Sequence, residues 1–379
     1  MYEMCKVWKD CGSEVTVITS PYDKSDIQSK KFVSRMNVEG INLIVINAGD
    51  SNKFGLIKRA YRATIFALVS SFYSITVNAD VLIASSGPIT IGIPGILGKL
   101  FSRKKLVFEV RDLWPGGAVE MGLIKNRFLK KVFFWFERKC YENSSLVIPC
   151  SPGMQEDINA RYPKVRCEVI PNACDNTLFQ STMPEDFVYP NWLKEDSTVF
   201  IYTGSLGLMD ACDDIIHGFN LLKDKENVKI VFIGDGTERS ILEELTRKYS
   251  LQEQVHFLGL IPKMEVVQWY KIATASFVVF KNYSVLSTSS PNKMFDSFAA
   301  NVPIIQNTAG WIKNLVNQEG VGLNVDAGNP ESMAISINSF IKNPSSLELM
   351  RSNCKRVAFD CFDRTKLSMR YHGFLEELV

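Results

Sequence analysis

The sequence predicts an α/β fold with two domains, each built around a parallel sheet. Short apolar runs typical of strands alternate with helical patterns along almost all of the 379 residues. Such alternation is typical of βαβ units, in which helices cover both faces of a parallel sheet. The runs also fall into two separate sets, and the length suits two or three domains rather than one.

A polar, proline-containing stretch at residues 180–197 separates the two sets of predicted strands. The first set is 14–19, 41–46, 81–84, 105–110, 146–150 and 167–170, and the second is 199–203, 228–233, 255–258, 275–279 and 302–306. The break itself lies near residues 171–175. We therefore predict one domain over 1–175 and a second over 176–362.

The amino-terminal segment departs from the pattern. A helix-like stretch comes before the strand at 14–19, whereas a nucleotide-type α/β domain normally opens with a strand. We expect the first strand and its glycine loop to be missing from this version of the chain. No signal peptide is expected, because Lys6, Lys9 and Asp10 interrupt any apolar core. The uncharged stretch 81–98 contains repeated Gly and Pro, which favours a strand, a loop and a buried helix over a membrane span.

Composition excludes several classes of protein. The formal net charge of +2 gives no general support to nucleic-acid binding. The nine cysteines form no CxxC pair, and the three histidines lie far apart in the sequence. We expect no metal site, and most cysteines should be small buried residues of a reducing compartment. No Asp-x-Asp triplet is present to clamp a metal–nucleotide complex.

Parallel sheets bind ligands at the carboxyl ends of their strands, so the loops after the strands are the candidate sites. Each of these loops carries Gly, Pro or charged residues, and together they describe a cleft between two facing domains. They are residues 85–88, 111–115, 204–207, 234–236, 259–263 and 289–296.

The segment 289–303 is the most informative of these loops. A Pro-Asn-Lys turn leads into a short amphipathic helix with Asp296 in its first turn. Backbone N–H groups and Lys293 suit a diphosphate, and Asp296 can accept hydrogen bonds from sugar hydroxyls. A capped helix between two strands explains the same pattern, and spacing alone does not separate the two interpretations.

Two glycine loops could also approach a phosphate. Gly204, Ser205 and Gly207 follow a strand and precede a helix, where glycine permits close contact with the backbone. Gly234, Asp235 and Gly236 have the same arrangement, and a plain strand-to-helix turn explains either loop equally well. The third glycine of a dinucleotide fingerprint and the Walker A lysine pattern are both absent, which disfavours NAD enzymes and P-loop NTPases.

Residues 111–115, RDLWP, end a strand of the first domain. Arg111 and Asp112 could form an ion pair that caps the loop. Alternatively they form a polar site in which Asp112 orients or deprotonates a hydroxyl.

Segments 53–79 and 123–139 are both basic and apolar. The first has no acidic residue and the second has one, Glu137. They could be core-packed helices with solvated basic ends. Because both segments lie in the first domain and both carry a net positive charge, we favour a face that contacts an anionic membrane.

These loops, in this order, resemble the retaining glycosyltransferases of family 4, which have the GT-B fold. The resemblance runs from Ser13 onward. Its most specific pieces are RDLWP at 111–115, IPNACD at 170–175, YTGSLG at 202–207, FIGDGTER at 232–239, VHFLGLIPK at 255–263 and SPNKMFDSFAANVPII at 290–305. The first and last pieces are similar to those of bacterial surface-polysaccharide enzymes, including N-acetyl-fucosamine transferases.

The resemblance implies two Rossmann-like domains facing across a cleft. The N-terminal one would bind the acceptor, with segment 363–379 packing back on it and Arg111 and Asp112 at the cleft. The C-terminal one would bind the donor. Leu260 and Ile261 would lie at the base, and Asp296 would match the family glutamate that holds the ribose. The donor-binding residues implied are Gly204, Ser205, Gly207, Gly234, Asp235, Gly236, Leu260, Ile261, Lys263, Ser290, Asn292, Lys293 and Asp296.

Three positions depart from the family pattern. Thr288 stands where the first glutamate of a Glu-x(7)-Glu pair is usual, Ser205 where an arginine is common, and Asn301 where a glycine is common. Each departure removes a contact or residue type that the family usually has near the donor.

The resemblance implies transfer of a sugar, with retention, from a nucleotide sugar to a polyprenyl-diphosphate-linked acceptor. UDP is the favoured nucleotide, no cofactor or metal is obligatory, and the pathway would be capsule or O-antigen synthesis. The protein would lie in the cytoplasm, peripheral on the inner face of a bacterial membrane. The alternatives are a nucleotide-sugar-binding protein without turnover and a GT-B nucleotide-sugar 2-epimerase.

Overall fold

The computed structural model describes residues 2–21, 27, 29, 31–49, 54–87, 89–181 and 187–379. Lys53 and Pro88, which belong to a predicted segment and a predicted loop, lie outside the described residues, as do residues 182–186. The chain divides into two compact units. Unit 1 comprises Met1–Pro171 and Thr365–Val379, and unit 2 comprises Asn172–Arg364.

Unit 2 is built on a six-stranded sheet in which all pairs are parallel, as the sequence predicts. Its order is β12-β11-β10-β7-β8-β9. The strands are β7 (Thr198–Thr203), β8 (Val228–Ile233), β9 (Val255–Gly259), β10 (Ala273–Val278), β11 (Ile304–Gln306) and β12 (Gly322–Asn324).

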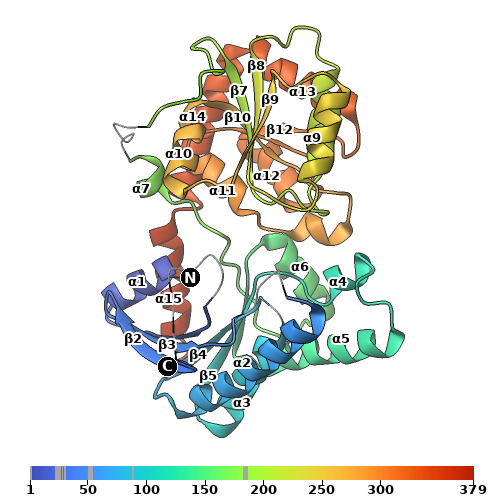
Figure 1. The fold of residues 1–379 in the computed structure, drawn as a ribbon. Coiled ribbons are helices and arrows are strands. Elements are labelled where there is room, and N and C mark those ends of the chain that lie inside the picture. Colours follow the sequence, from blue (N-terminus) through green and yellow to red (C-terminus); the bar gives the residue numbers. More distant parts are fainter. Residues whose placement is uncertain are drawn as a thin grey trace. The chain divides into compact units, whose positions relative to one another are not determined.

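Helices cover both faces of this sheet (Figure 1). Alternate residues of β7 point to opposite faces, so Val199 and Ile201 join one apolar cluster while Phe200 and Tyr202 join the other. Burial on both faces explains why these strands are nearly continuous apolar runs. The helices are α7 (Asn176–Phe179), α8 (Cys212–Asn220), α9 (Arg239–Lys248), α10 (Lys263–Ile272), α11 (Asn292–Ala299), α12 (Trp311–Glu319), α13 (Pro330–Lys342) and α14 (Pro344–Asp360).

Unit 1 contains two separate three-stranded sheets, with orders β1-β3-β2 and β4-β5-β6. The strands are β1 (Thr16–Thr19), β2 (Val33–Val38), β3 (Ile41–Ile46), β4 (Val81–Ser85), β5 (Lys105–Val110) and β6 (Leu146–Pro149). All pairs are parallel except β2 with β3. The β2–β3 hairpin turns at Glu39 and Gly40, both with positive φ, which suits a tight two-residue loop.

The first and last helices of the chain lie together in unit 1. The indole N–H of Trp8 in α1 donates to the Ser368 carbonyl oxygen of α15 at 2.9 Å, and the Trp8 and Tyr371 rings meet edge to face. The helices of this unit are α1 (Tyr2–Asp10), α2 (Leu56–Thr76), α3 (Gly92–Phe101), α4 (Gly116–Glu120), α5 (Arg127–Glu142), α6 (Pro152–Arg161) and α15 (Arg364–Glu376). The uncharged stretch 81–98 forms β4, a 3₁₀ turn and much of α3, which confirms the predicted strand, loop and helix.

Two strand predictions need correction. The predicted strand at 167–170 forms only a single bridge, between Cys167 and Val147, although the Glu168 and Ile170 N–H groups donate to carbonyl oxygens of β6. The structure also contains β2 and β12, which were not predicted. β2 alternates polar and apolar residues weakly, and β12 has only three residues.

Candidate functional site

Three glycine loops lie side by side at the carboxyl edge of the unit 2 sheet. The Gly204 N–H donates to the Ile233 carbonyl oxygen at 2.9 Å, and the Gly234 N–H donates to that of Gly259 at 2.8 Å. Through these bonds the loops after β7, β8 and β9 keep the same side-by-side order as the strands themselves. The predicted loops 204–207, 234–236 and 259–263 are therefore brought together.

The glycines of these loops are required by close packing of the backbone. A Cβ atom on Gly234 would lie 1.7 Å from the Gly204 carbonyl oxygen, and one on Gly236 would lie 2.2 Å from that of Leu206. Gly234 also has a φ of +143°. Loop packing alone thus demands glycine at both positions, independently of any ligand.

A largely buried lysine side chain lies at the end of β7. Lys293, in the first turn of α11, donates to the Tyr202 hydroxyl at 2.6 Å and lies 3.1 Å from Asp210 Oδ1. A Cβ atom on Gly204 would lie 3.1 Å from Lys293 Cε, so the side chain passes directly beside the first glycine loop. The structure therefore joins Lys293 to Gly204, as the predicted donor site requires.

Two opposing effects act on the Lys293 ammonium. Burial lowers the pKa of the ammonium below its ordinary value, and the Asp210 carboxylate partly opposes this by favouring the charged form. The Lys293 Nζ also lies 3.9 Å from the centre of the Tyr202 ring, a cation–π distance. Asp210 and Tyr202 thus hold a cation at the sheet edge.

The start of α11 has unused hydrogen-bonding capacity. Pro291 occupies the N-cap position, and no side chain caps the helix. The Ser290 hydroxyl oxygen is buried and, within the described residues, lacks a hydrogen-bond partner. Asn292 is exposed. Helix N–H groups, a hydroxyl and a nearby ammonium are the groups that bind phosphate oxygens.

Asp296 faces a second lysine. Lys263 Nζ donates to Asp296 Oδ2 at 2.5 Å, which brings together two residues of the predicted donor site. Burial raises the pKa of the Asp296 carboxyl, and the Lys263 cation partly opposes this. Leu260 is exposed and Ile261 is partly buried beside them. The Asp296 carboxylate is therefore only partly buried and can still accept hydrogen bonds from a ligand.

The unit 1 candidates lie at the end of β5. Arg111 Nη1 lies 3.8 Å from Glu109 Oε1, and the Arg111 N–H donates to the Ser86 hydroxyl at 3.0 Å. Asp112 is exposed, yet neighbouring protein atoms raise the pKa of its carboxyl, an effect that the Arg111 cation opposes. The Trp114 ring packs edge to face on Phe133, which makes it part of the loop's support.

Three residues near the predicted donor-site residues were not predicted themselves. Tyr202 and Asp210 contact Lys293, and Arg239 lies 3.9 Å from Asp235 at the start of α9. Tyr202 was assigned to a strand, and Asp210 lies beyond the loop that was considered. Arg239 is the last residue of the FIGDGTER piece. Its position just after a glycine loop could have been used to predict it as a site residue. Among the described residues, no cluster of three or more His, Cys, Asp or Glu side chains is placed to hold a metal ion.

Solved structures define the fold class. Sucrose-phosphate synthase from Thermosynechococcus elongatus matches with a TM-score of 0.76 at 16% identity, over 99% of this chain and 92% of that chain. The Anabaena protein HepE, in complex with UDP-glucose, gives a TM-score of 0.65 at 17% identity, over 88% and 86%. At these identities the likeness establishes the fold alone, which is GT-B.

Sequence profiles then place the chain among known families. The profile described as Glycosyltransferase Family 4 matches residues 1–178, and that of Glycosyl transferases group 1 matches residues 187–357. The chain thus carries glycosyltransferase domains of these two descriptions on a GT-B fold.

Curated relatives are distant. An uncharacterized glycosyltransferase of Methanocaldococcus jannaschii is 20% identical over 57% of this chain and 56% of that protein. The N-acetylgalactosamine-N,N'-diacetylbacillosaminyl-diphospho-undecaprenol 4-alpha-N-acetylgalactosaminyltransferase of Campylobacter jejuni is 25% identical over 65% of this chain and 64% of that protein. The chain therefore spans between about half and two thirds of the length of these relatives.

Proposed function

We propose that the protein transfers a sugar, with retention, from a UDP-sugar to a polyprenyl-diphosphate-linked saccharide. The observation that carries this proposal is the buried Lys293 ammonium between a glycine loop and the uncapped start of α11. HepE, of the same fold, was solved with UDP-glucose, and the Campylobacter relative is named for a diphospho-undecaprenol acceptor. Both names support the choice of substrates.

In this mechanism the bond between the sugar's anomeric carbon and the diphosphate oxygen breaks. The acceptor hydroxyl oxygen forms the new bond on the same face, through an oxocarbenium-like state. Its proton passes to the departing diphosphate. Lys293 and the first N–H groups of α11 stabilise the negative charge that develops on the leaving group. Asp210 acts through Lys293, by keeping it charged and in place.

The proposal gives Asp112 and Arg111 the acceptor side of the reaction. Asp112 follows β5 and keeps contact with solvent, so it can accept a hydrogen bond from an incoming hydroxyl. Arg111, next to it, supplies a cation suited to the acceptor's own diphosphate.

The test is a transfer assay with radiolabelled UDP-sugars, GDP-sugars and undecaprenyl-diphosphate-linked saccharides. A labelled lipid product with the donor's anomeric configuration supports the proposal. A 2-epimer of the donor sugar identifies the epimerase instead. Calorimetric binding of UDP without any sugar product identifies a binding protein without turnover. The same assay tests an N-acetyl-fucosamine donor and a capsule or O-antigen acceptor, which are the finer parts of the proposal.

Asp296→Ala is expected to weaken binding of the UDP-sugar by about 10- to 100-fold, the value of one hydrogen bond to a charged group. The proposed partners are the ribose hydroxyls, so dUDP should bind the wild-type protein nearly as weakly. Calorimetric titration measures both. Because burial raises the Asp296 pKa, binding should weaken on acidification before an ordinary exposed aspartate would be protonated. Unchanged affinity in the variant would remove Asp296 from the site.

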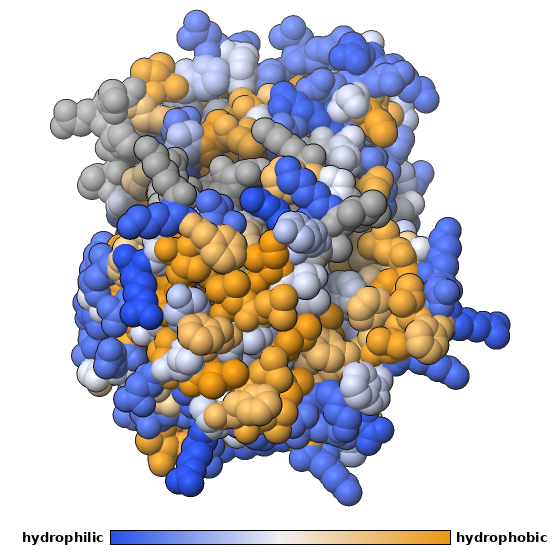
Figure 2. All heavy atoms as spheres, turned by 60° about the horizontal axis from the view of Figure 1, so that its bottom comes forward, coloured by the Kyte–Doolittle hydropathy of each residue, from blue (hydrophilic) through white to orange (hydrophobic). Residues whose placement is uncertain are grey.

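A membrane face on unit 1 is the second part of the proposal. Large apolar side chains are exposed on α2, α3 and α5, and α3 packs against both of the other helices. Figure 2 shows apolar side chains gathered on one face of the molecule. We define the membrane face as Tyr61, Leu68, Phe72, Leu100, Phe101, Leu123, Phe128, Leu129, Val132 and Trp135.

The charges around this face suit an anionic surface. Exposed basic residues of α2 and α5 include Arg59, Arg127 and Lys131. Glu137, the single acid of segment 123–139, is buried and pairs with Arg161 Nη1 at 2.5 Å, so it does not offset them. Within the described residues, none of the helices has both the length and the apolar character needed to cross a bilayer. The proposal therefore places the protein peripherally on the cytoplasmic face of the membrane.

The double variant Phe128→Ser/Trp135→Ser should lose about 10²-fold or more in affinity for vesicles, since each large apolar side chain contributes about 1.5–3 kcal/mol when buried. Co-sedimentation with vesicles of phosphatidylglycerol and phosphatidylethanolamine measures it. The matched control is Ile335→Ser/Leu349→Ser, which removes two equally exposed residues from unit 2. Equal binding by wild type and the first variant would contradict the membrane face.

A further inference from the structure

The IPNACD piece at 170–175 has no part in the proposed reaction, yet the structure places it beside the donor-site residues. Asn172 is the first residue of unit 2, and its side-chain Nδ2 donates to the Ser290 carbonyl oxygen at 2.6 Å. Ser290 immediately precedes Pro291, the N-cap of α11. A side chain 118 residues away in sequence therefore fixes the backbone that leads into this helix.

A second side chain holds the same backbone. The indole N–H of Trp311, the first residue of α12, donates to the Ser289 carbonyl oxygen at 2.8 Å. The Pro291 carbonyl oxygen accepts from the Met294 N–H at 3.1 Å, within the first turn of α11. Three successive carbonyl oxygens, those of Ser289, Ser290 and Pro291, thus all point to protein donors.

The direction of these carbonyl groups matters for the binding of an anion. A carbonyl oxygen carries a partial negative charge, so one turned toward a diphosphate would repel it, whereas a helix N–H group attracts it. The groups that this arrangement leaves for a ligand are the first N–H groups of α11 and the buried Ser290 hydroxyl, which lacks a partner among the described residues. The indole and the amide are both neutral, so they orient the backbone without placing an ion beside the site.

The segment that carries Asn172 is anchored by other bonds as well. Cys174 is fully buried, and its thiol donates to the Phe295 carbonyl oxygen of α11 at 3.2 Å. Asn176 Nδ2 donates to Asp363 Oδ2 at 2.9 Å. Loss of the Asn172 amide therefore removes one bond to the start of α11 and leaves the segment attached to unit 2.

We propose that Asn172 and Trp311 are positioning residues for the donor diphosphate. By holding two carbonyl oxygens away from the ligand, they make the start of α11 present hydrogen-bond donors to it. Both residues act through the backbone of residues 289–290. The inference rests on the proposed function, because it assigns the diphosphate to the same helix start. It predicts a loss of affinity for the phosphates and not for the nucleoside.

Calorimetric titration of the full chain with UDP and with uridine tests the role of Asn172. Asn172→Ala should weaken UDP binding by about tenfold, because the Ser290 carbonyl oxygen becomes free to turn toward the diphosphate. Uridine, which lacks the phosphates, should bind this variant and the wild type equally. Asn172→Asp keeps the size of the side chain but replaces the N–H donor with an oxygen, so it should lose more UDP affinity than Asn172→Ala.

Asn176→Ala is the matched control for this segment. It removes another side-chain amide four positions further along, one that bonds Asp363. Thermal unfolding of both alanine variants records how far each change destabilises unit 2. UDP affinity in Asn176→Ala should stay at the wild-type value even if this variant is the less stable of the two.

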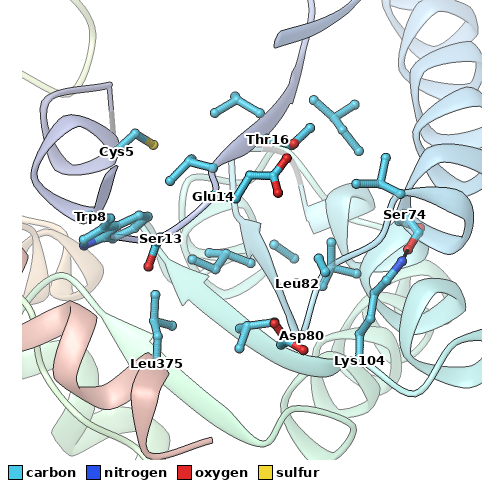
Figure 3. Close-up of a pocket in the computed structure, with 18 of the residues that line it drawn as sticks. Cys5, Trp8, Ser13, Glu14, Thr16, Ser74, Asp80, Leu82, Lys104 and Leu375 are labelled. Carbon is cyan, nitrogen blue, oxygen red and sulfur yellow. Dashed lines mark hydrogen bonds between the residues drawn. The ribbon is translucent and has the colours of Figure 1, made fainter. Parts of the chain in front are cut away.

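Trp311→Phe tests the second side chain, because it removes the indole N–H and keeps an aromatic ring. UDP binding should weaken again while uridine binding stays unchanged. Trp8→Phe is the matched control. Trp8 is also buried and its indole N–H also donates to a carbonyl oxygen, that of Ser368, but it lines a cavity of about 840 Å³ in unit 1 (Figure 3). We expect wild-type UDP affinity in Trp8→Phe.

The outcomes separate this inference from the proposed function. Wild-type UDP affinity in Asn172→Ala or in Trp311→Phe would overturn the role of that residue and leave the proposed donor site standing. Equal losses for UDP and uridine would mean that the change disturbs the whole unit, and would overturn the role as well. A smaller loss in Asn172→Asp than in Asn172→Ala would assign the effect to volume, with the same result. Failure of the wild-type chain to bind UDP would instead overturn the proposed function, and this inference with it.

Discussion

Lys293→Met should reduce the rate of sugar transfer by about 10²- to 10³-fold, the cost of removing one charge-stabilising donor from a leaving-group site. The side chain keeps its length but loses the ammonium that bonds Tyr202 and faces Asp210. Asp210 would then be left without its cation, which adds to the loss. Initial rates at saturating UDP-sugar, with UDP affinity by calorimetry, separate the effect on the reaction from that on binding.

Lys229→Met provides the matched control. Lys229 is also largely buried, on β8 of the same sheet, and its ammonium donates to the Glu253 carbonyl oxygen at 2.6 Å. It lies near the amino end of its strand, away from the glycine loops. We expect this variant to transfer sugar at nearly the wild-type rate. Similar losses in both variants would mean that buried lysines matter here for folding, and would contradict the role proposed for Lys293.

Gly234→Ala should destabilise unit 2 by on the order of 3–5 kcal/mol, through overpacking and backbone strain together. The added methyl would meet the Gly204 carbonyl oxygen at 1.7 Å, and the backbone there cannot move without displacing two strands. Urea unfolding followed by fluorescence measures the loss.

Gly373→Ala makes the same chemical change, but we expect it to stabilise the protein. Gly373 lies within α15, and a Cβ atom there would meet nothing within 4 Å. This variant should be more stable by about 0.5–1 kcal/mol. A Gly234→Ala protein as stable as wild type would show that the two loops are not packed as described.

The parts of the fold that the sequence predicts are those with strong local signals. The predicted bounds at 41–46, 105–110 and 228–233 are confirmed as β3, β5 and β8, because these strands are apolar runs bounded by polar residues. The β2 strand lacks such a run, and its place depends on pairing with β3 across a tight turn. The separation of unit 1 into two sheets was not predicted, because it depends on long-range packing.

In the candidate site, too, residues with a local sequence signal could be predicted, and their distant partners could not. Lys293 and Asp296 could be predicted because they follow a Pro-Asn turn at a helix start. The partners Tyr202 and Asp210 lie 91 and 83 residues away in sequence, and only tertiary structure brings them to Lys293. Lys263, the partner of Asp296, lies 33 residues away and also reaches it only through the tertiary structure. Whether these residues bind a nucleotide sugar stays a prediction until the transfer assay is done.

The return of the chain from unit 2 to unit 1 has a consequence for synthesis on the ribosome. Unit 2 is one continuous segment, Asn172–Arg364, whereas unit 1 needs Thr365–Val379 for completion. The Trp8 indole therefore waits for the Ser368 carbonyl oxygen, which is synthesised after all of unit 2. Vectorial folding usually favours the N-terminal domain. Here the order is reversed: unit 2 can finish folding first, and unit 1 is completed only after the residues that follow unit 2 have been synthesised.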